Sequence, residues 1–273
     1  MERHRVPEFT AQDVKRLRDA TGAGMMDAKR ALTETGGDEE KAAAWLREKG
    51  LGKAAERADR ENVQGAVAAA SNDGAAALVE LKSETDFVAK SPDFLALANE
   101  LAQLVLDKGE AAVEEKSTAL DDLKIKLKEN IAVGRVVRFD AAPGNALDVY
   151  LHQPSGPPSL NGVLVEVEGG TKELAHSVAL HISFARPSVL ARDEFTAEEI
   201  DKERELVLAE TKNEGKPEQA WPKIVEGKLN GWFKRTPGGA LLDQPYVHDE
   251  KQSVQQAVGD AKVVRFAQIE VGG

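Results

Sequence analysis

The sequence predicts an α+β protein in which helices cover two small antiparallel sheets, and three observations lead to this fold class. Segments in which apolar and polar residues alternate stand between segments with a helical period. The same order of strands and helices occurs twice along the chain. A charged stretch near residue 200 combines strong helix-start signals with a thin apolar stripe, as is typical of an exposed helical hairpin.

The composition limits the class of protein. The chain has 273 residues, enough for two or three domains with cores of their own. It contains no cysteine, which excludes disulfides and thiolate metal sites and fits a cytoplasmic location. The net charge of -11 argues against nucleic acid as the main partner. No apolar run is long enough to span a membrane, and no apolar segment follows the basic N-terminus as a signal peptide requires.

Residues 9–52 are expected to form a module of three short helices. Thr10 is placed to cap the first helix, with Asp13 at the capping-box position and Phe9 as a hydrophobic staple. Residues 1–8, which precede the module, are short and charged, and we expect them to be disordered.

The second helix is expected at residues 24–33 and the third at residues 38–50, where glycines end both patterns. The third helix buries Trp45, which gives the module its own core. Met25 shares a stripe with the buried positions of the second helix, so we expect it in the core. Met26 is displaced from that stripe by about a third of a turn, and a flexible Met there suits a surface that contacts a partner.

Residues 53–62 are charged and are expected to form a helical linker. The unit that follows, residues 63–142, starts with a hairpin that turns at Asn72-Asp73-Gly74. The second strand of this hairpin alternates apolar and polar residues, which predicts one buried and one exposed face. The expected strands are Val63–Ala70, Ala75–Lys82 and Ala132–Asp140, and the expected helices are Pro92–Lys108 and Thr118–Asn130.

Residues 143–273 repeat this order around a helical insertion. The expected strands are Leu147–His152, Gly162–Glu168 and Lys262–Val271, and the expected helices are Thr171–Ala185 and Lys251–Val258. The closing strands of both units contain Val-Val-Arg-Phe, at residues 136–139 and 263–266. A tetrapeptide can recur by chance, so the matching order of elements is the better indication that the two units are related.

The insertion, residues 196–236, is expected to be an antiparallel helical arm that projects from the body. Thr196 and Glu199 form a capping box, so the first helix begins there. The chain turns at residues 215–217, and Pro222 begins the return helix. The apolar stripe of the first helix is thin, which favours an exposed arm over a buried element.

A short connection, residues 85–90, joins the second strand to the helix that follows. It carries Asp86, Phe87 and Val88 where a polar turn would do. Two interpretations stay open from the residues alone. In the first, Phe87 and Val88 fold back and cap the sheet, which is the commoner fate of apolar residues beside a core. In the second, an aromatic ring beside a carboxylate is presented to a partner from a rigid base.

The sequence shows no sign of a metal or catalytic site. His176 and His181 are five residues apart on one expected helix, so they do not share a face, and no third ligand is in view. His181 falls beside apolar positions and is expected at the border of the core. The chain has no P-loop, no dinucleotide fingerprint and no nucleophile elbow. We therefore expect neither an enzyme nor a cofactor-binding protein.

Two motifs carry a resemblance to a known family. Thr85-Asp86-Phe87-Val88 after a strand and Thr21-Gly22-Ala23-Gly24-Met25-Met26-Asp27 near the N-terminus resemble bacterial elongation factor Ts (EF-Ts), and the match begins at Phe9 and spans nearly the whole chain. That family is the guanine-nucleotide exchange factor for EF-Tu, the GTPase of translation elongation. The resemblance implies that the N-terminal module is UBA-like, similar to ubiquitin-associated domains. It also implies that the arm is the coiled-coil insertion through which some relatives self-associate.

The resemblance further implies which residues contact EF-Tu. Asp86 and Phe87 would insert between two helices of the GTPase domain near its Mg²⁺ and promote GDP release. The N-terminal module would touch the same domain, and His152, which follows Tyr150 in a Tyr-x-His pattern, would reach a different one. From the residues alone, a solvent-exposed strand end is an equally good interpretation of His152. The residues so implied are Arg18, Met25, Met26, Thr85, Asp86, Phe87, Val88 and His152.

An exchange factor makes and breaks no covalent bond, so no catalytic residue, cofactor or metal is expected, and neither nucleic acid nor a membrane is expected as a partner. An alternative from a different class is a non-catalytic scaffold whose helical arm dimerises and whose small module binds a protein. Members of the EF-Ts family commonly end in a further helical module. The present chain stops directly after the closing strand, which leaves open what takes the place of the contacts of such a module.

Overall fold

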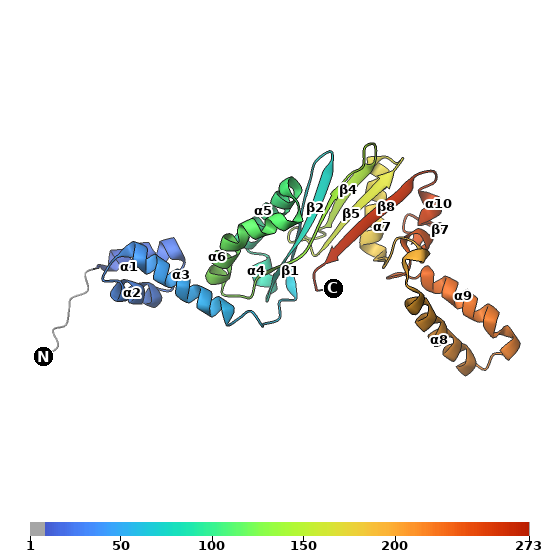
Figure 1. Cartoon of the computed structure of the whole chain (residues 1–273), viewed down its shortest axis with the longest axis horizontal. Coiled ribbons are helices and arrows are strands. Elements are labelled where there is room, and N and C mark those ends of the chain that lie inside the picture. The colour runs from blue at the N-terminus through green and yellow to red at the C-terminus, as the bar shows by residue number, and fades with distance from the viewer. Residues whose placement is uncertain (1–8, 273) are drawn as a thin grey trace.

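The computed structural model describes residues 9–272, and the disorder expected for residues 1–8 lies outside this range. The molecule is elongated: three helices cluster at one end, two sheets stand in the middle, and a pair of long helices projects beyond them (Figure 1). The α+β class, the two three-stranded antiparallel sheets and the helical pair are confirmed. No helix among the described residues is long and apolar enough to cross a membrane.

The N-terminal cluster consists of α1 (Ala11–Thr21), α2 (Met25–Glu34) and α3 (Glu39–Ala55). Thr10 and Asp13 form the expected capping box at the start of α1. Trp45 is only half-buried, with the Lys49 ammonium 4.5 Å from its ring centroid. Smaller residues fill the core instead, namely Val14, Leu17, Ala28, Ala31, Leu32, Ala42 and Leu46.

Helix α3 continues to Ala55, whereas the sequence pattern predicted its end at Gly50. Gly50 lies within the helix and packs against Ile125 of α6 (Ser117–Leu127). A Cβ at position 50 would be 2.8 Å from the Ile125 Cγ2 atom, closer than Cβ atoms come in real structures. This glycine therefore permits the close approach of α3 to α6 and is not a helix terminator.

Met25 is not in the core, and that prediction is wrong. Its side chain is 58% exposed, although Ala28 and Leu32 on the same stripe are fully buried. The stripe therefore leaves the packed region within the first turn of α2. Met26 is 74% exposed, as expected for a contact surface.

The first sheet has the order β1 (Gln64–Ser71), β2 (Ala75–Ser83) and β3 (Ala132–Asp140). Ala77, Val79 and Leu81 of β2 pack against α5 (Pro92–Lys108) and α6 in one core cluster. Ala76 and Leu78, which alternate with them, pack on the opposite face. Strand β2 is therefore buried on both faces, and the predicted exposed face is wrong.

The second sheet has the order β4 (Ala146–His152), β5 (Asn161–Glu168) and β8 (Lys262–Glu270). Val163, Val165 and Val167 of β5 pack against α7 (Lys172–Ala185). Leu164, which points the other way, packs on the first sheet. The remaining short helical turns are Glu110–Lys116, Arg192–Glu194, Glu218–Ala220 and Leu241–Asp243.

The segment predicted as a helix at residues 251–258 begins as a strand. It belongs to β7 (Asp249–Ser253), which pairs with β6 (Pro245–Tyr246). The helical turn α10 (Val254–Ala257) starts only after Ser253, whose hydroxyl accepts a hydrogen bond from the Gln256 N–H at 3.3 Å. The capping box of Ser253 and Gln256 fixes this start.

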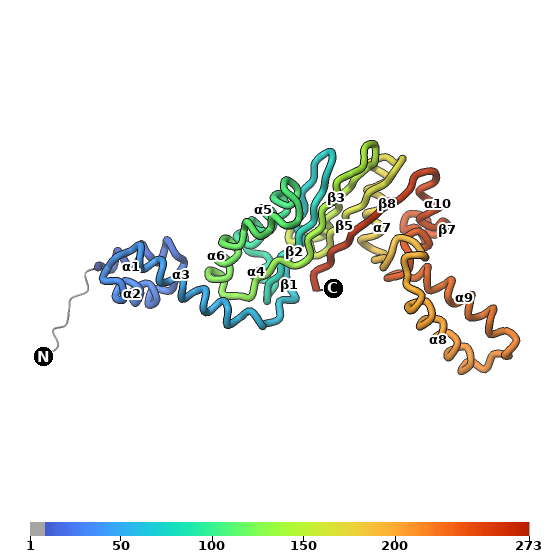
Figure 2. The backbone as a smooth tube through the Cα atoms, in the orientation of Figure 1, coloured from blue at the N-terminus to red at the C-terminus, as the bar shows by residue number. Residues whose placement is uncertain are grey.

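The two sheets pack face to face, so the body has four layers with helices outside both sheets (Figure 2). Gly162 lies at the closest point, where a Cβ would be 2.7 Å from the Val67 Cγ1 atom. Beside it, the Val67 N–H donates a hydrogen bond to the Ser159 carbonyl at 2.8 Å. This bond joins the first sheet to the loop that connects β4 and β5.

Strand register shows how the two sheets correspond. Val133 lies opposite Leu81 in the first sheet, and Val263 lies opposite Val167 in the second. The Val-Val-Arg-Phe tetrapeptide begins at Val263 in β8 but at Val136, beyond Val133, in β3. The tetrapeptide therefore occupies different positions in the two sheets, and its recurrence says nothing about their relationship.

A buried glutamate next to an irregular pairing supports the relationship better. Glu80 and Glu166 occupy equivalent positions on the two central strands and are 6% and 2% exposed. The Glu80 carboxylate accepts a hydrogen bond from the Arg135 N–H at 3.1 Å, and the Glu166 carboxylate accepts one from the Arg265 guanidinium at 2.7 Å. Each bond gives a buried carboxyl group a hydrogen-bond partner, without which its burial would be costly.

The arm consists of α8 (Ala197–Asn213) and α9 (Trp221–Phe233), and the predicted capping box of Thr196 and Glu199 is confirmed. Its outer part holds together through a small cluster of its own, Val207, Val225 and Leu229. Its base differs, because Trp232 packs on Phe195, with ring centroids 4.4 Å apart, and on Ala240. The arm base is therefore part of a buried aromatic cluster.

His181 of α7 is buried, as expected, and connects three segments. Its Nδ1 accepts a hydrogen bond from the Val247 N–H at 3.2 Å, so Nε2 carries the proton and donates to Gln244 Oε1 at 3.0 Å. The Gln244 amide in turn donates to the carbonyls of Arg235, at 3.0 Å, and Gly238. Burial lowers the pKa of His181, which keeps the ring neutral in the folded protein.

Replacing residues 205–225 by a short Gly-Ser linker should leave the body folded. Arg204 and Glu226, whose side chains lie 3.8 Å apart, become the ends of the shortened arm. Connection length changes loop-closure free energy by only roughly 0.6 kcal/mol per doubling, so urea unfolding should stay cooperative with a similar midpoint. By contrast, Trp232→Ala at the base of the arm should lower the free energy of unfolding by about 3–5 kcal/mol. Loss of cooperative unfolding in the shortened variant would show that the body needs the outer arm.

Stability should fall as the pH drops below the unfolded-state pKa of His181, about 6.5. Its pKa is lower in the folded protein, so the unfolded chain binds the additional proton and gains stability from it. His181→Gln removes this contribution, so its urea midpoint should vary less between about pH 7 and pH 5. His152→Gln, at an exposed strand end, serves as the control for replacing a histidine outside the core. Identical profiles for wild type and His181→Gln would contradict the assignment.

Candidate functional site

The connection at residues 85–90 contains a one-turn helix, α4 (Asp86–Ala89), where the sequence predicted only a short connection. Thr85 caps it, because its hydroxyl accepts a hydrogen bond from the Val88 N–H at 3.3 Å. Ala89 is buried and Val88 is half-buried against the first core. Asp86 and Phe87 point outward, and the Phe87 side chain is 83% exposed. We call α4 with these two side chains the peg.

Val88 and Phe87 take different positions in the structure, so the two interpretations of this segment must be judged for each residue. Val88 folds back onto the core, as the first interpretation expects. Phe87 does not, so the capping interpretation is wrong for the ring. A large aromatic side chain at this exposure gains nothing for folding, because its apolar surface stays in water.

Glu129, two residues beyond the end of α6, holds the base of the peg, a role that sequence reasoning missed. Its Oε2 accepts hydrogen bonds from the N–H groups of Glu84, at 3.0 Å, and Thr85, at 3.1 Å. Its Oε1 accepts from the Thr85 hydroxyl at 2.5 Å. Bonds to an ionised acceptor are stronger than neutral ones, so this carboxylate fixes the residues from which the peg begins.

Glu84 in turn contacts Asn130, the residue that follows Glu129. Its Oε1 accepts a hydrogen bond from the Asn130 N–H at 2.7 Å. The Asn130 side-chain amide then donates to the carbonyls of Ala58, at 3.0 Å, and Arg60, at 2.6 Å. The peg base, the connection before β3 and the end of the linker thus form one hydrogen-bonded unit.

Asp86 is ionised and oriented. The Lys90 ammonium lies 2.6 Å from its Oδ2 atom, one helical turn away. This hydrogen bond, together with the charge of Lys90, lowers the pKa of Asp86. Because both side chains are well exposed, a partner can readily displace this ion pair.

A hollow of about 690 Å³ adjoins the peg, between it and the β4–β5 loop. A second hollow, of about 840 Å³, lies on the far side of that loop beside His152. Both are lined by Ser155, Gly156, Pro158 and Leu160, so the loop forms a ridge between them. His152 is exposed, and its Nδ1 atom lies 2.9 Å from the Tyr150 hydroxyl.

The remaining implied residues, Arg18, Met25 and Met26, lie on the N-terminal cluster at the end of the molecule (Figure 1). Arg18 pairs with Asp19 at 2.8 Å. These three residues line neither of the hollows beside the β4–β5 loop. The structure therefore brings the peg and His152 onto one continuous surface but does not gather the cluster residues with them.

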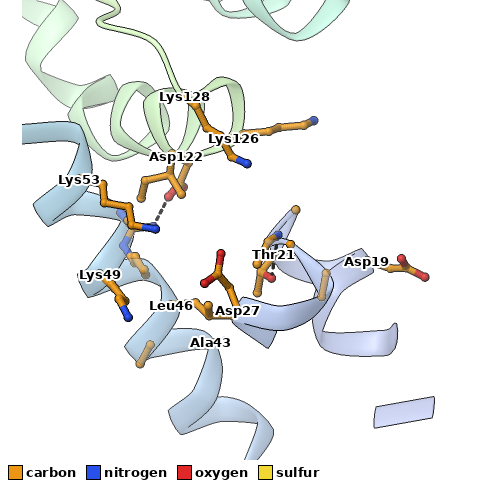
Figure 3. Close-up of a pocket in the computed structure, with 18 of the residues that line it drawn as sticks. Asp19, Thr21, Asp27, Ala43, Leu46, Lys49, Lys53, Asp122, Lys126 and Lys128 are labelled. Carbon is orange, nitrogen blue, oxygen red and sulfur yellow. Dashed lines mark hydrogen bonds and ion pairs between the residues drawn. The ribbon is translucent and has the colours of Figure 1, made fainter. Parts of the chain in front are cut away.

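A third hollow, of about 690 Å³, separates the N-terminal cluster from α6 (Figure 3). Lys49 and Lys53 of α3 and Lys126 and Lys128 near the end of α6 line it, together with Asp27. An ion pair between Arg47 of α3 and Asp122 of α6 joins the cluster to the body here. None of the eight implied residues lines this hollow.

Across residues 9–272, no group of three or more His, Asp or Glu side chains is arranged to hold a metal ion. His176 does not join His181. Its Nδ1 atom lies 3.0 Å from the Asp148 Oδ2 atom, and its ring packs edge-on against Tyr150. The histidines that the sequence singled out thus serve separate local contacts.

Comparison with known proteins shows which family the chain resembles. A family model described as "Elongation factor TS" matches residues 84–273. The chain is 46% identical to "Elongation factor Ts" of Clavibacter michiganensis subsp. michiganensis over 278 residues, covering 97% of this chain and 98% of the relative. It is 41% identical to the protein of that name from Deinococcus deserti, covering 96% and 99%. It is 40% identical to that of Alkalilimnicola ehrlichii, covering 97% and 92%.

The matched region includes the peg and the whole second sheet, and the relatives align from end to end. Identity at this level over nearly the full length is shared by proteins of one family. The chain therefore belongs to the elongation factor Ts family, a family of translation elongation factors of protein biosynthesis.

Proposed function

We propose that this chain is the guanine-nucleotide exchange factor for EF-Tu and acts in the cytoplasm during translation elongation. The observation that carries the proposal is the peg: an exposed aromatic ring and an ionised carboxylate on a braced one-turn helix. Such a factor forms no covalent bond with the nucleotide and is not an enzyme. Its task is to bind one conformation of the GTPase better than another.

The peg suits this task because of where a GTPase holds GDP. The backbone of the P-loop and a Mg²⁺ ion hold the β-phosphate, so displacing either loosens the nucleotide. In the proposed mechanism, Phe87 enters between two helices of the GTPase domain near the Mg²⁺, and the Asp86 carboxylate accompanies it. Thr85, which caps the turn, and Val88, which is half-buried against the core, flank these two residues and complete the proposed contact.

Rigidity is what makes the peg effective. A flexible loop would spend binding free energy on becoming ordered, whereas the bonds of Glu129 hold this one in place beforehand. Free energy gained from Phe87 is then available to stabilise the nucleotide-free GTPase. By linkage, GDP weakens the binding of the factor to the same extent.

The other implied residues extend the interface. Met25 and Met26 are exposed at the start of α2, where flexible thioethers adapt to a partner surface. We propose that they and Arg18 bind the GTPase domain, and that His152 contacts a different domain of EF-Tu. The net charge of -11 is in keeping with a protein partner rather than a nucleic acid.

Phe87→Ala should slow exchange without unfolding the protein. Its ring is exposed, so the free energy of unfolding should change by less than about 0.5 kcal/mol, against about 3–5 kcal/mol for a buried aromatic. GDP release from EF-Tu should slow by on the order of tenfold, as for a hot-spot residue. Asp86→Ala should also slow release, and the double variant should be non-additive because the two residues share one surface.

The measurements are the urea midpoint and the release rate of labelled GDP for each variant. Leu206, a 54% exposed apolar residue on the arm, provides the control, and Leu206→Ala should match wild type in both measurements. If wild type does not accelerate GDP release at all, the exchange function is wrong and the scaffold alternative gains support. If Phe87→Ala loses several kcal/mol of stability yet exchanges normally, the ring is structural.

Glu129→Ala tests the brace. The substitution removes both acceptor oxygens, so the N–H groups of Glu84 and Thr85 lose their partner. Leaving such donors unpaired costs about 1–3 kcal/mol, so local opening of the peg should become easier. Amide hydrogen exchange at residues 84–90 should accelerate and GDP release should slow, whereas a rate equal to wild type would make the brace dispensable.

A further inference from the structure

Two contacts that join the N-terminal cluster to the body fall on the second half of α6. Arg47 of α3 pairs with Asp122, and Gly50 of the same helix packs against the half-buried Ile125. The hollow in Figure 3 separates the cluster from α6 beside these contacts, so the docking surface is narrow. A single residue on this surface can therefore decide whether the cluster stays docked.

The body by itself holds α6 through few side chains. Leu123 is buried, whereas Leu120 and Leu127 are only half-buried against the first core. The helix then ends at Lys128, whose φ of 61° is a left-handed conformation that is unfavourable for a residue with a Cβ. Helix ends fray unless packing holds them. The contact of Ile125 with α3 thus supplies packing to a part of α6 to which the body supplies little.

The two residues that hold the base of the peg follow directly on this part of α6. Glu129 accepts hydrogen bonds from the Thr85 hydroxyl, at 2.5 Å, and from the N–H groups of Glu84 and Thr85. The Asn130 N–H donates to the Glu84 carboxylate at 2.7 Å. Both residues lie within three positions of Leu127, the last residue of the helix. Fraying of the last turn of α6 therefore removes these partners from the peg.

The linker connects the same hydrogen-bonded unit to α3. The Asn130 side-chain amide donates to the carbonyls of Ala58, at 3.0 Å, and Arg60, at 2.6 Å. The Arg60 guanidinium also lies 3.5 Å from the Glu84 carboxylate. Because α3 ends at Ala55, shortly before these linker residues, a movement of α3 reaches the base of the peg through the linker as well as through α6.

We propose that docking of the N-terminal cluster controls the rigidity of the peg: the docked cluster holds the end of α6, and the end of α6 holds the peg. Gly50 and Ile125 are then positioning residues, which act on the peg through Glu129. By linkage, whatever fixes the peg also favours docking of the cluster. The coupling is a property of the chain alone, whereas its effect on GDP release rests on the proposed function.

Gly50→Leu tests the coupling, because its side chain would enter the space of Ile125. Gly52→Leu is the matched control on the same helix, since a Cβ at position 52 meets nothing within 4 Å. Position 50 lies beyond Leu46, the last residue in the core of the cluster, so the fold of the cluster should be preserved. Amide hydrogen exchange at residues 84–90 should accelerate by roughly 2- to 30-fold in Gly50→Leu, the range in which residues between coupled sites change the coupling.

Ile125→Ala, added to Gly50→Leu, removes the atoms in collision and should return the protection of residues 84–90 toward wild type. Exchange at the amides of the first sheet, measured in the same samples, checks that the body stays folded. With EF-Tu present, Gly50→Leu should slow GDP release, as Glu129→Ala does, whereas Gly52→Leu should match wild type.

Unchanged hydrogen exchange at residues 84–90 in Gly50→Leu would overturn the coupling, even if GDP release slows, because the cluster would then act only through its own contact with the GTPase. Equal acceleration in Gly52→Leu, or no restoration by Ile125→Ala, would also overturn it, since the docking contact would not be the cause. If wild type does not accelerate GDP release, the proposed function fails, and hydrogen exchange in the chain alone still decides the coupling.

Discussion

The structure depends on one constraint: the central strands of both sheets are apolar on both faces. Each sheet therefore needs two covers, and each finds one in its helices and the other in the opposite sheet. The close approach at Gly162 is what lets the sheets meet. Because β2 and β5 are locked in this way, the segments attached to their ends have fixed starting points, and the peg and the β4–β5 loop are two such segments.

Function and folding are separated at the level of single side chains. In α4, Ala89 and Val88 attach the turn to the core, whereas Phe87 on the same turn makes no such contribution. In α7, Ile182 and Ala185 hold the helix, and Phe184 between them points outward. A rigid element that presents an aromatic ring to solvent gives up part of the apolar burial available to it. What it gains is a contact group whose orientation is set before any partner arrives.

The features that depend on residues close together in the chain could be predicted from the sequence. The capping boxes at Thr10 and Thr196 and the span of α5 follow from neighbouring residues, and they are confirmed. Contacts between distant residues could not be seen this way. Gly50 looked like a helix end because nothing in the sequence shows that Ile125 packs against it, and Glu129 is 44 residues from the Thr85 it braces.

The proposed exchange cycle places one requirement on the peg. A wedge that favours only the nucleotide-free GTPase must lose affinity when a nucleotide returns, by the same factor that it loosened the nucleotide. Phe87 stands on a turn braced by Glu129, but its own ring does not support the core. The strength of the proposed wedge can therefore be adjusted at this position at little cost to folding.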